Sequence, residues 1–311
     1  MELDDHWHLF GPAPFIPDFR ILSSRGQTRS VSWGQSFLGH KTNQFESSLG
    51  DKSPIEWTDA SWNPTTGCSK VSPGCQNCYA ERLSKRLKAM GNPKYRNGFD
   101  FTLQPNAMDL PLRWKEPRKI FVNSMSDLFH ELMPDEYLDM CFNVMEEANW
   151  HVYQILTKRP ERMARFVKRY GRIPDHIWMG TSVELAMYKP RIDLLRQVNV
   201  KIRFISFEPL LGPIGKVNLR GIAWAITGGE SGPNHRPIDR EWVRELRDQC
   251  VSQRVAFFFK QWGGATPKSG GRRLDRRFWN EYPDYVPQYS GKPVTVLARN
   301  KTPSLSRQSQ S

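Results

Sequence analysis

The chain has 311 residues, of which 38% are hydrophobic and 25% are charged, and its formal net charge is +13. This composition is typical of a soluble globular protein with a sizeable core, and no apolar run is long enough to cross a bilayer. The N-terminal stretch MELDDHWHLFGPAPF is acidic and interrupted by proline, so it does not resemble a secretory signal. We therefore expect a cytoplasmic protein without membrane contact, whose positive charge permits a nucleic-acid partner but does not require one.

The two ends of the chain show no sustained hydrophobic periodicity. They are rich in Ser, Gly, Gln and Asn, the stretch KSGGRRLDRRFW is locally basic, and the last residues, SLSRQSQS, are of low complexity. We predict an irregular N-terminal extension over residues 1–50, a folded domain over residues 51–264, and a basic, partly disordered tail over residues 265–311.

Short apolar runs alternate with helical patterns between these ends. Six runs are predicted to be buried strands, over residues 119–127, 151–160, 176–184, 202–212, 222–232 and 255–264. Helical periodicity is found over residues 135–149, around 161–170, around 188–198 and over 238–250. Cys141 and Cys250 lie on apolar faces of two of these helices, so we interpret them as core residues.

Apolar strands separated by single helices indicate a parallel sheet that is covered on both faces. Such a sheet is either a β/α barrel, partial or complete, or an open doubly wound sheet. Each predicted strand ends in polar residues, and a barrel gathers the carboxyl ends of its strands at one mouth. An open sheet would spread them along an edge, with a ligand only at its switch point. We therefore favour an α/β fold of the TIM-like parallel β/α barrel type, partial or complete.

Three of the five cysteines lie within eleven positions, at Cys68, Cys75 and Cys78. Glycine and proline between them allow the backbone to fold around a small group. Helical residues begin directly after Cys78, where the positive potential of a helix N-terminus favours thiolate. Clustered cysteines in a cytoplasmic protein more often bind metal or perform redox chemistry than form disulfides.

The count of three thiols leaves more than one kind of site open. A structural zinc site normally has four protein ligands, so zinc would need a distant fourth ligand such as His130 or His151. An iron–sulfur cluster held by three cysteines leaves one iron open to an exogenous ligand. A disulfide with one spare thiol is the third alternative. We favour the cluster because it explains the odd number of thiols.

The chain resembles a bacterial and phage family, often called the phage three-cysteine-motif proteins. Seven blocks carry the resemblance in order: IEWTDASWNPTTGCSKVSPGCQNCYAER, NSMSDLFHE, LTKRPERM, GTSVE, FISFEPLLGPI, WAITGGESG and FKQWGG. They cover roughly residues 54–264. The family is similar to a divergent branch of the radical S-adenosylmethionine (SAM) enzymes, and its members are often paired with a three-Cys-motif partner protein.

This resemblance implies a [4Fe–4S] cluster on Cys68, Cys75 and Cys78, with SAM bound to the open iron through its amino and carboxylate groups. It also implies a reducing donor of the flavodoxin or ferredoxin type. The spacing departs from the common radical-SAM loop, in which three residues separate the first two cysteines, because six residues separate them here. The aromatic residue that often precedes the last cysteine is replaced by Asn77.

The polar residues at the strand ends are the remaining candidates for a site at the mouth. We assign to cofactor binding Gly228, Gly229, Glu230, Ser231, Ser182 and Glu184. We assign to catalysis or substrate binding Asp127, His130, Lys158, Glu208 and Lys260. The two glycines can bring backbone N–H groups close to a ligand, and Glu230 can accept a hydrogen bond from an ammonium group. A glycine turn beside a solvated glutamate is the alternative interpretation.

These features together predict a radical-SAM-like enzyme that acts on an unknown substrate, with a nucleic acid or nucleotide favoured by the basic charge. One alternative is a non-catalytic module, stapled by zinc or a cluster, that recognises nucleic acid or a phage partner. Another is an enzyme that uses its open iron as a Lewis acid without SAM.

Overall fold

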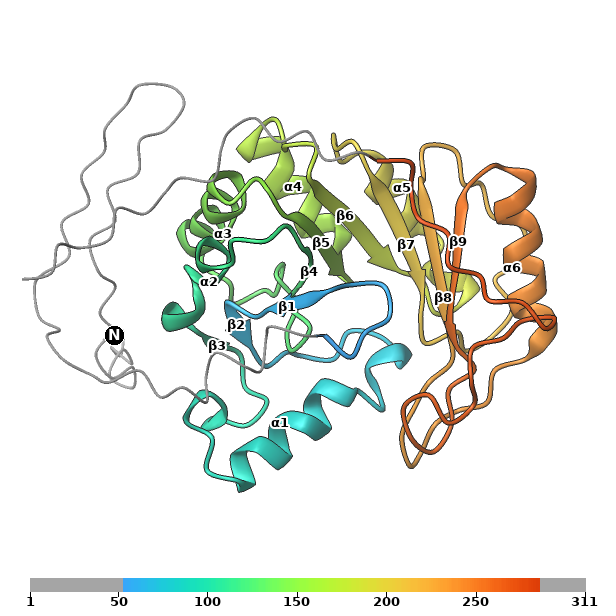
Figure 1. Cartoon of the computed structure of the whole chain (residues 1–311), viewed down its shortest axis with the longest axis horizontal. Coiled ribbons are helices and arrows are strands. Elements are labelled where there is room, and N and C mark those ends of the chain that lie inside the picture. The colour runs from blue at the N-terminus through green and yellow to red at the C-terminus, as the bar shows by residue number, and fades with distance from the viewer. Residues whose placement is uncertain (1–52, 286–311) are drawn as a thin grey trace, which may run out of the picture. The chain divides into compact units, whose positions relative to one another are not determined.

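The sheet at the centre of the fold is parallel and has seven strands (Figure 1). The computed structural model describes residues 53–285. In their order across the sheet, which is also their order along the chain, the strands are β1 (Ala60–Trp62), β4 (Lys119–Val122), β5 (Val152–Thr157), β6 (Ile177–Ser182), β7 (Arg203–Phe207), β8 (Trp224–Gly228) and β9 (Ala256–Gln261). A strand order without reversal has no switch point, which excludes the open doubly wound alternative. The sheet is curled into a partial β/α barrel, so the predicted fold class is confirmed.

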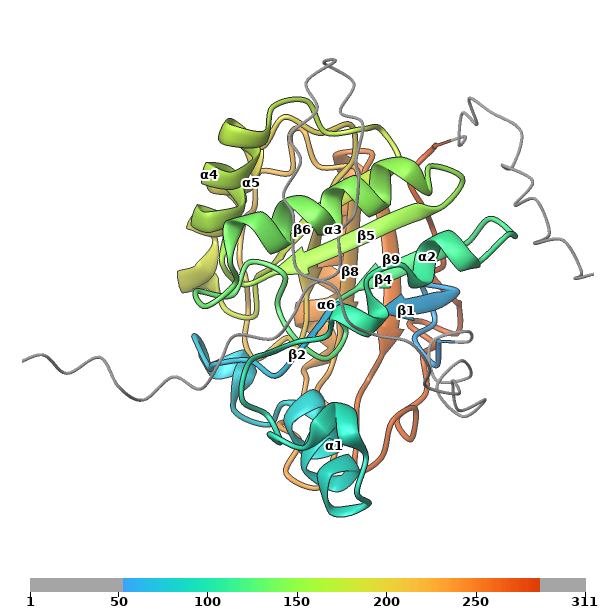
Figure 2. The ribbon, with the colours of Figure 1, turned by 90° about the vertical axis from the view of Figure 1, so that its left-hand side faces the viewer.

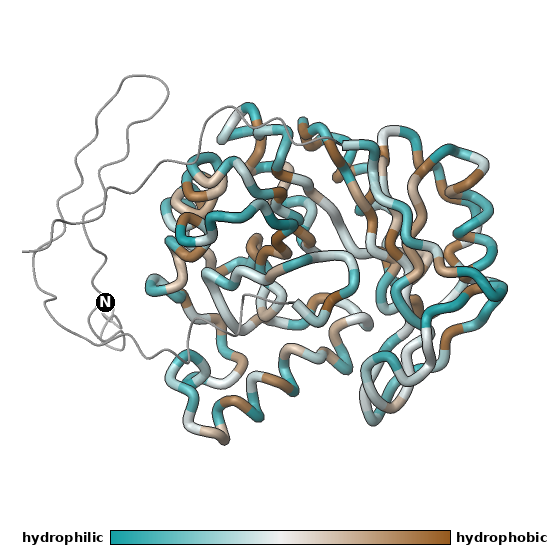
Figure 3. The backbone as a smooth tube through the Cα atoms, in the orientation of Figure 1, coloured by the Kyte–Doolittle hydropathy of each residue, from teal (hydrophilic) through white to brown (hydrophobic). Residues whose placement is uncertain are grey.

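Four helices connect the strands and cover one face of the sheet (Figures 1 and 2). They are α3 (Asp135–Glu147), α4 (Pro160–Tyr170), α5 (Pro190–Arg196) and α6 (Arg240–Ser252). All four were predicted from helical periodicity, and Figure 3 shows hydrophobic and hydrophilic residues alternating along them. Their bounds differ from the predicted ranges by a few residues, as is usual at frayed helix ends.

The segment between β1 and β4 carries the smaller elements. They are the antiparallel pair β2 (Thr65–Thr66) and β3 (Thr102–Leu103), the helices α1 (Tyr79–Ala89) and α2 (Leu110–Arg113), and the 3₁₀ turns η1 (Pro73–Cys75), η2 (Pro93–Tyr95) and η3 (Pro105–Ala107). A fourth 3₁₀ turn, η4 (Ala186–Tyr188), precedes α5. β1 is not among the six predicted strands, because three residues are too few to show a period.

The strands are shorter than predicted because their polar ends leave the sheet. β4, for example, ends at Val122 rather than at residue 127. Asn123 follows it with a φ of 60°, a left-handed conformation that a strand does not accommodate. The polar residues expected within the strand ends therefore lie in loops at the carboxyl edge of the sheet.

Alternation along each strand separates two apolar layers. In β5, Tyr153 and Ile155 pack with the helices in the larger core, whereas Val152 packs on the opposite, inner face. The inner cluster consists of Trp57, Phe121, Val152, Trp178, Ile202, Phe204, Trp224, Ile226 and Phe258. Most of these side chains come from the first half of their strands, so aromatic packing fills the amino-terminal end of the inner face and leaves polar residues at the carboxyl-terminal end.

The C-terminal part of the described chain packs on this inner cluster. Tyr282 and Tyr285 contact it, and the Trp224 indole donates a hydrogen bond of 2.9 Å to the carbonyl of Glu281. Residues 265–285, which the sequence assigns to the tail, thus include a segment that covers the barrel, whereas residues 286–311 and the N-terminal extension lie outside the described residues. Among the helices of residues 53–285, none has the length and apolarity that a bilayer span requires.

Candidate functional site

The first cysteine of the loop formed by residues 67–78, here called the cysteine loop, is fixed by its backbone neighbours. Gly67 has a φ of +79°, and a Cβ there would lie 2.1 Å from the carbonyl oxygen of Asp100, so only glycine fits. The Gly67 N–H donates to the Met125 carbonyl at 3.0 Å, and the Cys68 N–H donates to the Phe99 carbonyl at 3.0 Å. These contacts hold Cys68 at the carboxyl edge of the sheet.

The other two cysteines lie on short turns farther along the loop. Cys75 ends η1, and its Sγ lies 3.8 Å from the Ser72 hydroxyl. Cys78 is the residue directly before α1, as the sequence predicts. All three thiols are free and only partly buried, whereas Cys141 and Cys250 are free and fully buried in the core.

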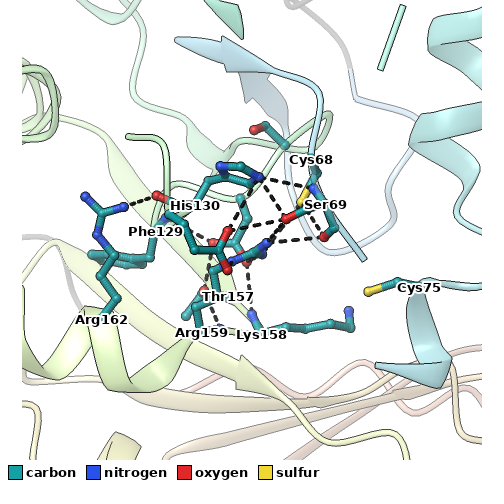
Figure 4. Close-up of polar contacts among 12 residues, drawn as sticks. Cys68, Ser69, Cys75, Phe129, His130, Thr157, Lys158, Arg159 and Arg162 are labelled. Atoms are coloured by element: carbon teal, nitrogen blue, oxygen red, sulfur yellow. Dashed lines mark hydrogen bonds and ion pairs between the residues drawn. The ribbon is translucent and has the colours of Figure 1, made fainter. Parts of the chain in front are cut away.

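Arg159, the residue directly before α4, ties the first cysteine to the sheet (Figure 4). Its Nε donates to Glu131 at 2.7 Å, and its Nη1 donates to Asp127 at 3.1 Å and to Cys68 Sγ at 3.6 Å. Its Nη2 donates to the carbonyl of Ser69 at 3.2 Å and to the hydroxyl of Ser69 at 2.7 Å. Burial acts to lower the pKa of Arg159, but the bond to Glu131 and the charge of Asp127 raise it above its usual value. The guanidinium therefore stays charged and uses all of its donors.

Asp127 is the centre of the same network. Its side chain is 8% exposed, and its Oδ1 accepts from the Thr157 hydroxyl at 2.7 Å and from the Phe129 N–H at 3.0 Å. Its Oδ2 accepts from the Lys158 N–H and from Arg159, both at 3.1 Å. Both oxygens of this predicted catalytic carboxylate thus have protein partners that hold the loop.

His130 packs directly against the cysteine loop. Its Nε2 lies 3.0 Å from the Ser69 hydroxyl, and its ring stacks on Phe101 with the ring centres 4.4 Å apart. Burial lowers the pKa of His130, so the imidazole is neutral near pH 7. Burial and the charge of Asp127 raise the pKa of Cys68 to about 12, although the charge of Arg159 opposes them. Metal binding to this thiol would therefore have to displace its proton.

A second arginine holds the far end of the cysteine loop. The Glu230 carboxylate, two residues after β8, accepts from Arg236 at 2.5 Å and from the Asn77 amide at 2.9 Å. Arg236 also donates to the Pro73 carbonyl at 3.0 Å. Burial opposes ionisation of Glu230, but these hydrogen bonds lower its pKa below the usual value. Arg82 adds a bond of 2.8 Å to the carbonyl of Ser231.

Of the two glycines before Glu230, Gly229 is required by backbone packing at the strand end. A Cβ on Gly229 would lie 2.1 Å from the carbonyl oxygen of Trp262, and the Gly229 N–H donates to the Gln261 carbonyl at 2.9 Å. The carbonyl of Gly228 accepts from the Leu210 N–H at 2.9 Å. The structure therefore places this motif against β9, with a protein partner for the Gly229 N–H.

The remaining predicted residues lie on the inner face of the barrel mouth. Lys158 Nζ donates to the Ser182 hydroxyl at 3.3 Å, and Figure 4 shows this lysine extending toward Cys75. Glu208, after β7, forms an ion pair of 2.5 Å with Lys260 of β9, and both side chains are 18% exposed. These two pairs line the mouth on either side of the loop.

Glu184 is a buried carboxylate of the mouth with an unused oxygen atom. It is fully buried, and its Oε2 accepts from Arg191 at 2.9 Å. Its Oε1 has no hydrogen-bond partner among the described residues. A Cβ on Gly74 would lie 3.1 Å from this oxygen, so the carboxylate lies directly under the cysteine loop beside Cys75. A ligand donor between the loop and the sheet would meet this oxygen.

The fit of a metal site depends on how the three sulfurs are grouped. Within residues 53–285, no three His, Cys, Asp or Glu side chains are grouped so that they could hold one metal ion. His151 does not supply a fourth ligand, because its two ring nitrogens bond to the backbone of Arg118 and Pro111. The ligands of a [4Fe–4S] cube bind different irons and stand farther apart than the ligands of one ion. Three free thiols on one loop are the kind of donor that holds an iron–sulfur cluster.

Sequence reasoning misses the residues that hold the loop from a distance. It assigns none of Arg236, Asn77, Glu131 and Arg159 to the site. Asn77 and Glu230 are 153 residues apart, so no local pattern connects them. The one local signal is that Arg159 lies two residues after a buried strand, where a charge needs a partner.

The family model described as "Protein of unknown function (DUF5131)" matches residues 52–283. The chain belongs to the DUF5131 family. No curated protein gives a significant match to it.

The DUF5131 chain also has a distant structural similarity to spore photoproduct lyase. One solved structure is a mutant of that enzyme with bound AdoMet and dinucleoside spore photoproduct, with 12% identity, a TM-score of 0.39, and coverage of 65% of this chain and 64% of that chain. A second mutant with dinucleoside spore photoproduct gives 12% identity, a TM-score of 0.37, and coverage of 73% and 72%. The chain spans just under two thirds of the length of the first of these proteins.

Proposed function

We propose that this protein is a radical-SAM-like enzyme that binds a [4Fe–4S] cluster through Cys68, Cys75 and Cys78. The observation that carries the proposal is the position of three free thiols on one loop, which is clamped across the carboxyl end of a partial parallel β/α barrel. This end of such barrels is where active sites are built. Three thiolates leave one coordination position for SAM.

The residues of the chain would hold and orient this site. When bound, the cluster would supply the electron that cleaves SAM reductively, and a flavodoxin- or ferredoxin-type protein would supply that electron. Arg159 and Asp127 fix Cys68 through the contacts described above. The unpaired oxygen of Glu184 would accept a hydrogen bond from an amino or hydroxyl group of the ligand.

The other groups at the mouth offer charge and proton positions for substrate. Lys158 would attract a carboxylate or phosphate, since it extends toward Cys75 and, within residues 53–285, the Ser182 hydroxyl is the only partner of its ammonium group. The Glu208–Lys260 pair, at 2.5 Å, offers a hydrogen-bond acceptor and a hydrogen-bond donor side by side to a substrate at the mouth. Glu230 and Ser231 would support the loop, since Asn77, Arg236 and Arg82 already occupy them.

A non-catalytic binding module is the second candidate function. The observation in its favour is that Asp127 and Glu230, two carboxylates expected in the chemistry, are already occupied by arginines and backbone donors. In such a module the cluster would only staple the loop, and the loop would present a surface to nucleic acid or to a three-Cys-motif partner protein.

Anaerobic reconstitution of the full chain with iron and sulfide tests the proposal. We expect a brown protein with broad visible absorption that, once reduced, converts SAM to 5′-deoxyadenosine. Alanine at Cys68, Cys75 or Cys78 should abolish cluster loading, whereas Cys141→Ala, which removes a buried core thiol, should load normally. Equal loading in all four variants would contradict the assignment, and loading without SAM turnover would favour the binding module or a Lewis-acid cluster.

A further inference from the structure

The outer surface carries a groove between α4 and α5 that the proposed chemistry does not use. Its main part has a volume of about 640 Å³ and is lined by Glu161, Ala164, Arg165, Val167, Lys168, Gly171, Arg172, Leu194, Gln197 and Asn199. A second hollow of about 370 Å³ shares Glu161 and Leu194 with it and is also lined by Val71, Glu131, Lys158 and Arg159. The two hollows are therefore neighbours, and Val71 of the cysteine loop borders the second one.

Three cations of this groove are free of carboxylates. Arg165, Lys168 and Arg172 are exposed, and within residues 53–285 none of them has an ion pair or hydrogen bond through its side chain. By contrast, Arg162 and Arg169 on the side of α4 that faces α3 are paired with Asp135 and Asp139. Positive charge is thus neutralised on one side of the helix and left available on the side that lines the groove.

The spacing of these cations suits a regular polyanion. Arg165 and Lys168 are three positions apart and lie on one face of α4, and Arg172 lines the same groove two residues beyond the end of the helix. The eleven residues of α4 span about 16 Å, at about 1.5 Å of rise per residue, which is a few nucleotides of one strand. Gln197 and Asn199 offer hydrogen-bonding groups on the opposite wall, and Ala164, Val167 and Leu194 supply an apolar floor.

We propose that this groove binds the phosphodiester backbone of a single-stranded nucleic acid and leads it to the mouth of the barrel. Arginine and lysine contacts to phosphate dominate such binding and carry no base specificity. Glu161 is shared by the two hollows and opposes the strand by charge, whereas Glu131 of the second hollow is paired with Arg159 at 2.7 Å. The inference concerns binding alone, so it stands or falls independently of the cluster.

Fluorescence anisotropy of the full chain with labelled oligothymidylate and oligouridylate of equal length tests this proposal. Binding should be similar for both probes, because the backbone is what the groove contacts. The triple variant Arg165→Gln, Lys168→Gln, Arg172→Gln should reduce the slope of log K against log salt by about 2, since each phosphate contact on a single strand contributes about 0.7. Glu161→Gln should tighten binding.

A matched variant with the same loss of charge controls for net charge. Arg86→Gln, Lys88→Gln and Arg96→Gln remove three exposed cations from and beside α1, which lies away from α4 in Figures 1 and 2. This control should keep the salt slope of the wild-type protein. Equal slopes for the two triple variants would overturn the proposal, and so would equally tight binding of an oligoglutamate of the same charge, which would indicate an acidic peptide as the occupant.

Discussion

Replacing Arg159 with methionine should destabilise the protein by about 3–4 kcal/mol. The substitution keeps most of the length of a side chain that is 7% exposed, but it removes the charge that faces Asp127 at 3.1 Å. Breaking a buried ion pair by removing one partner costs about 3–5 kcal/mol, because the other charge stays buried without compensation. We expect the lower part of this range, since Asp127 keeps the Phe129 and Lys158 N–H groups and the Thr157 hydroxyl.

Urea denaturation of the full chain, followed by tryptophan fluorescence, measures this loss as a shift of the unfolding midpoint at constant slope. The matched control is Arg165→Met, whose side chain is exposed and unpaired within residues 53–285, so its effect should stay within about 0.5 kcal/mol. Hydrogen exchange should also become faster around Cys68 and Ser69 in the Arg159 variant, because the guanidinium no longer holds them.

The double variant Arg159→Met, Asp127→Asn examines the mechanism itself. With asparagine at position 127, removal of the Arg159 charge leaves no unpaired carboxylate buried. The double variant should therefore lose less unfolding free energy than the two single variants lose in sum. Additive losses would show that the two groups are not coupled. A loss below about 1 kcal/mol for Arg159→Met alone, the size of one ordinary hydrogen bond, would refute the buried-charge argument.

Three further predictions concern the loop and its glycines. The bond from Arg159 lowers the pKa of Glu131 from its usual 4.5 to about 2, so the stability that this pair contributes should be complete above about pH 5 and lost as the pH falls toward 2. Measured against pH, the difference in unfolding free energy between wild type and Glu131→Gln should therefore shrink in acid. A difference that stays constant over this range would contradict the prediction. Glu230→Gln should speed hydrogen exchange in the cysteine loop with little effect on the sheet, because the neutral side chain loses the ion pair with Arg236 and weakens the bond to Asn77. Unchanged exchange in the loop would show that Glu230 does not hold it. Gly229→Ala should lower the melting temperature far more than Gly221→Ala. The new Cβ at residue 229 would lie 2.1 Å from a backbone oxygen, whereas the new Cβ at residue 221 would meet nothing within 4 Å, so that variant should lose only about 1–2 kcal/mol to left-handed backbone strain. Equal shifts of the melting temperature would contradict the packing argument.

The sequence alone was sufficient for the parallel sheet and its covering helices. Burial is recorded directly in the local pattern, with a period of two in strands and of 3.6 in helices. When strands and helices alternate along the chain, each helix serves as the crossover between two parallel strands, so the repeated order predicts a parallel sheet. For the same reason the sequence places Lys158, Ser182, Glu184, Glu208 and Lys260 at the carboxyl edge, where the structure finds them.

Two parts of the fold, β1 and the segment around Tyr282, depend on long-range contacts that leave no periodic pattern in the local sequence. β1 is too short to show alternation, and it is defined by its pairing with β4 about sixty residues later. The segment that contains Tyr282 reads as part of a polar tail, yet it packs on Trp224 and covers the inner face of the barrel. Burial of these residues depends on a surface that exists only once the sheet has formed.

The clamps on the cysteine loop were decided by the tertiary structure alone. Arg159 reaches Cys68 across 91 residues of sequence, and Arg236 reaches Pro73 across 163. The sequence alone does not distinguish an arginine that is exposed to solvent from one that is buried against a distant carboxylate. The fold decides between these states, because only the curled sheet brings the two parts of the loop within hydrogen-bond distance of the two arginines.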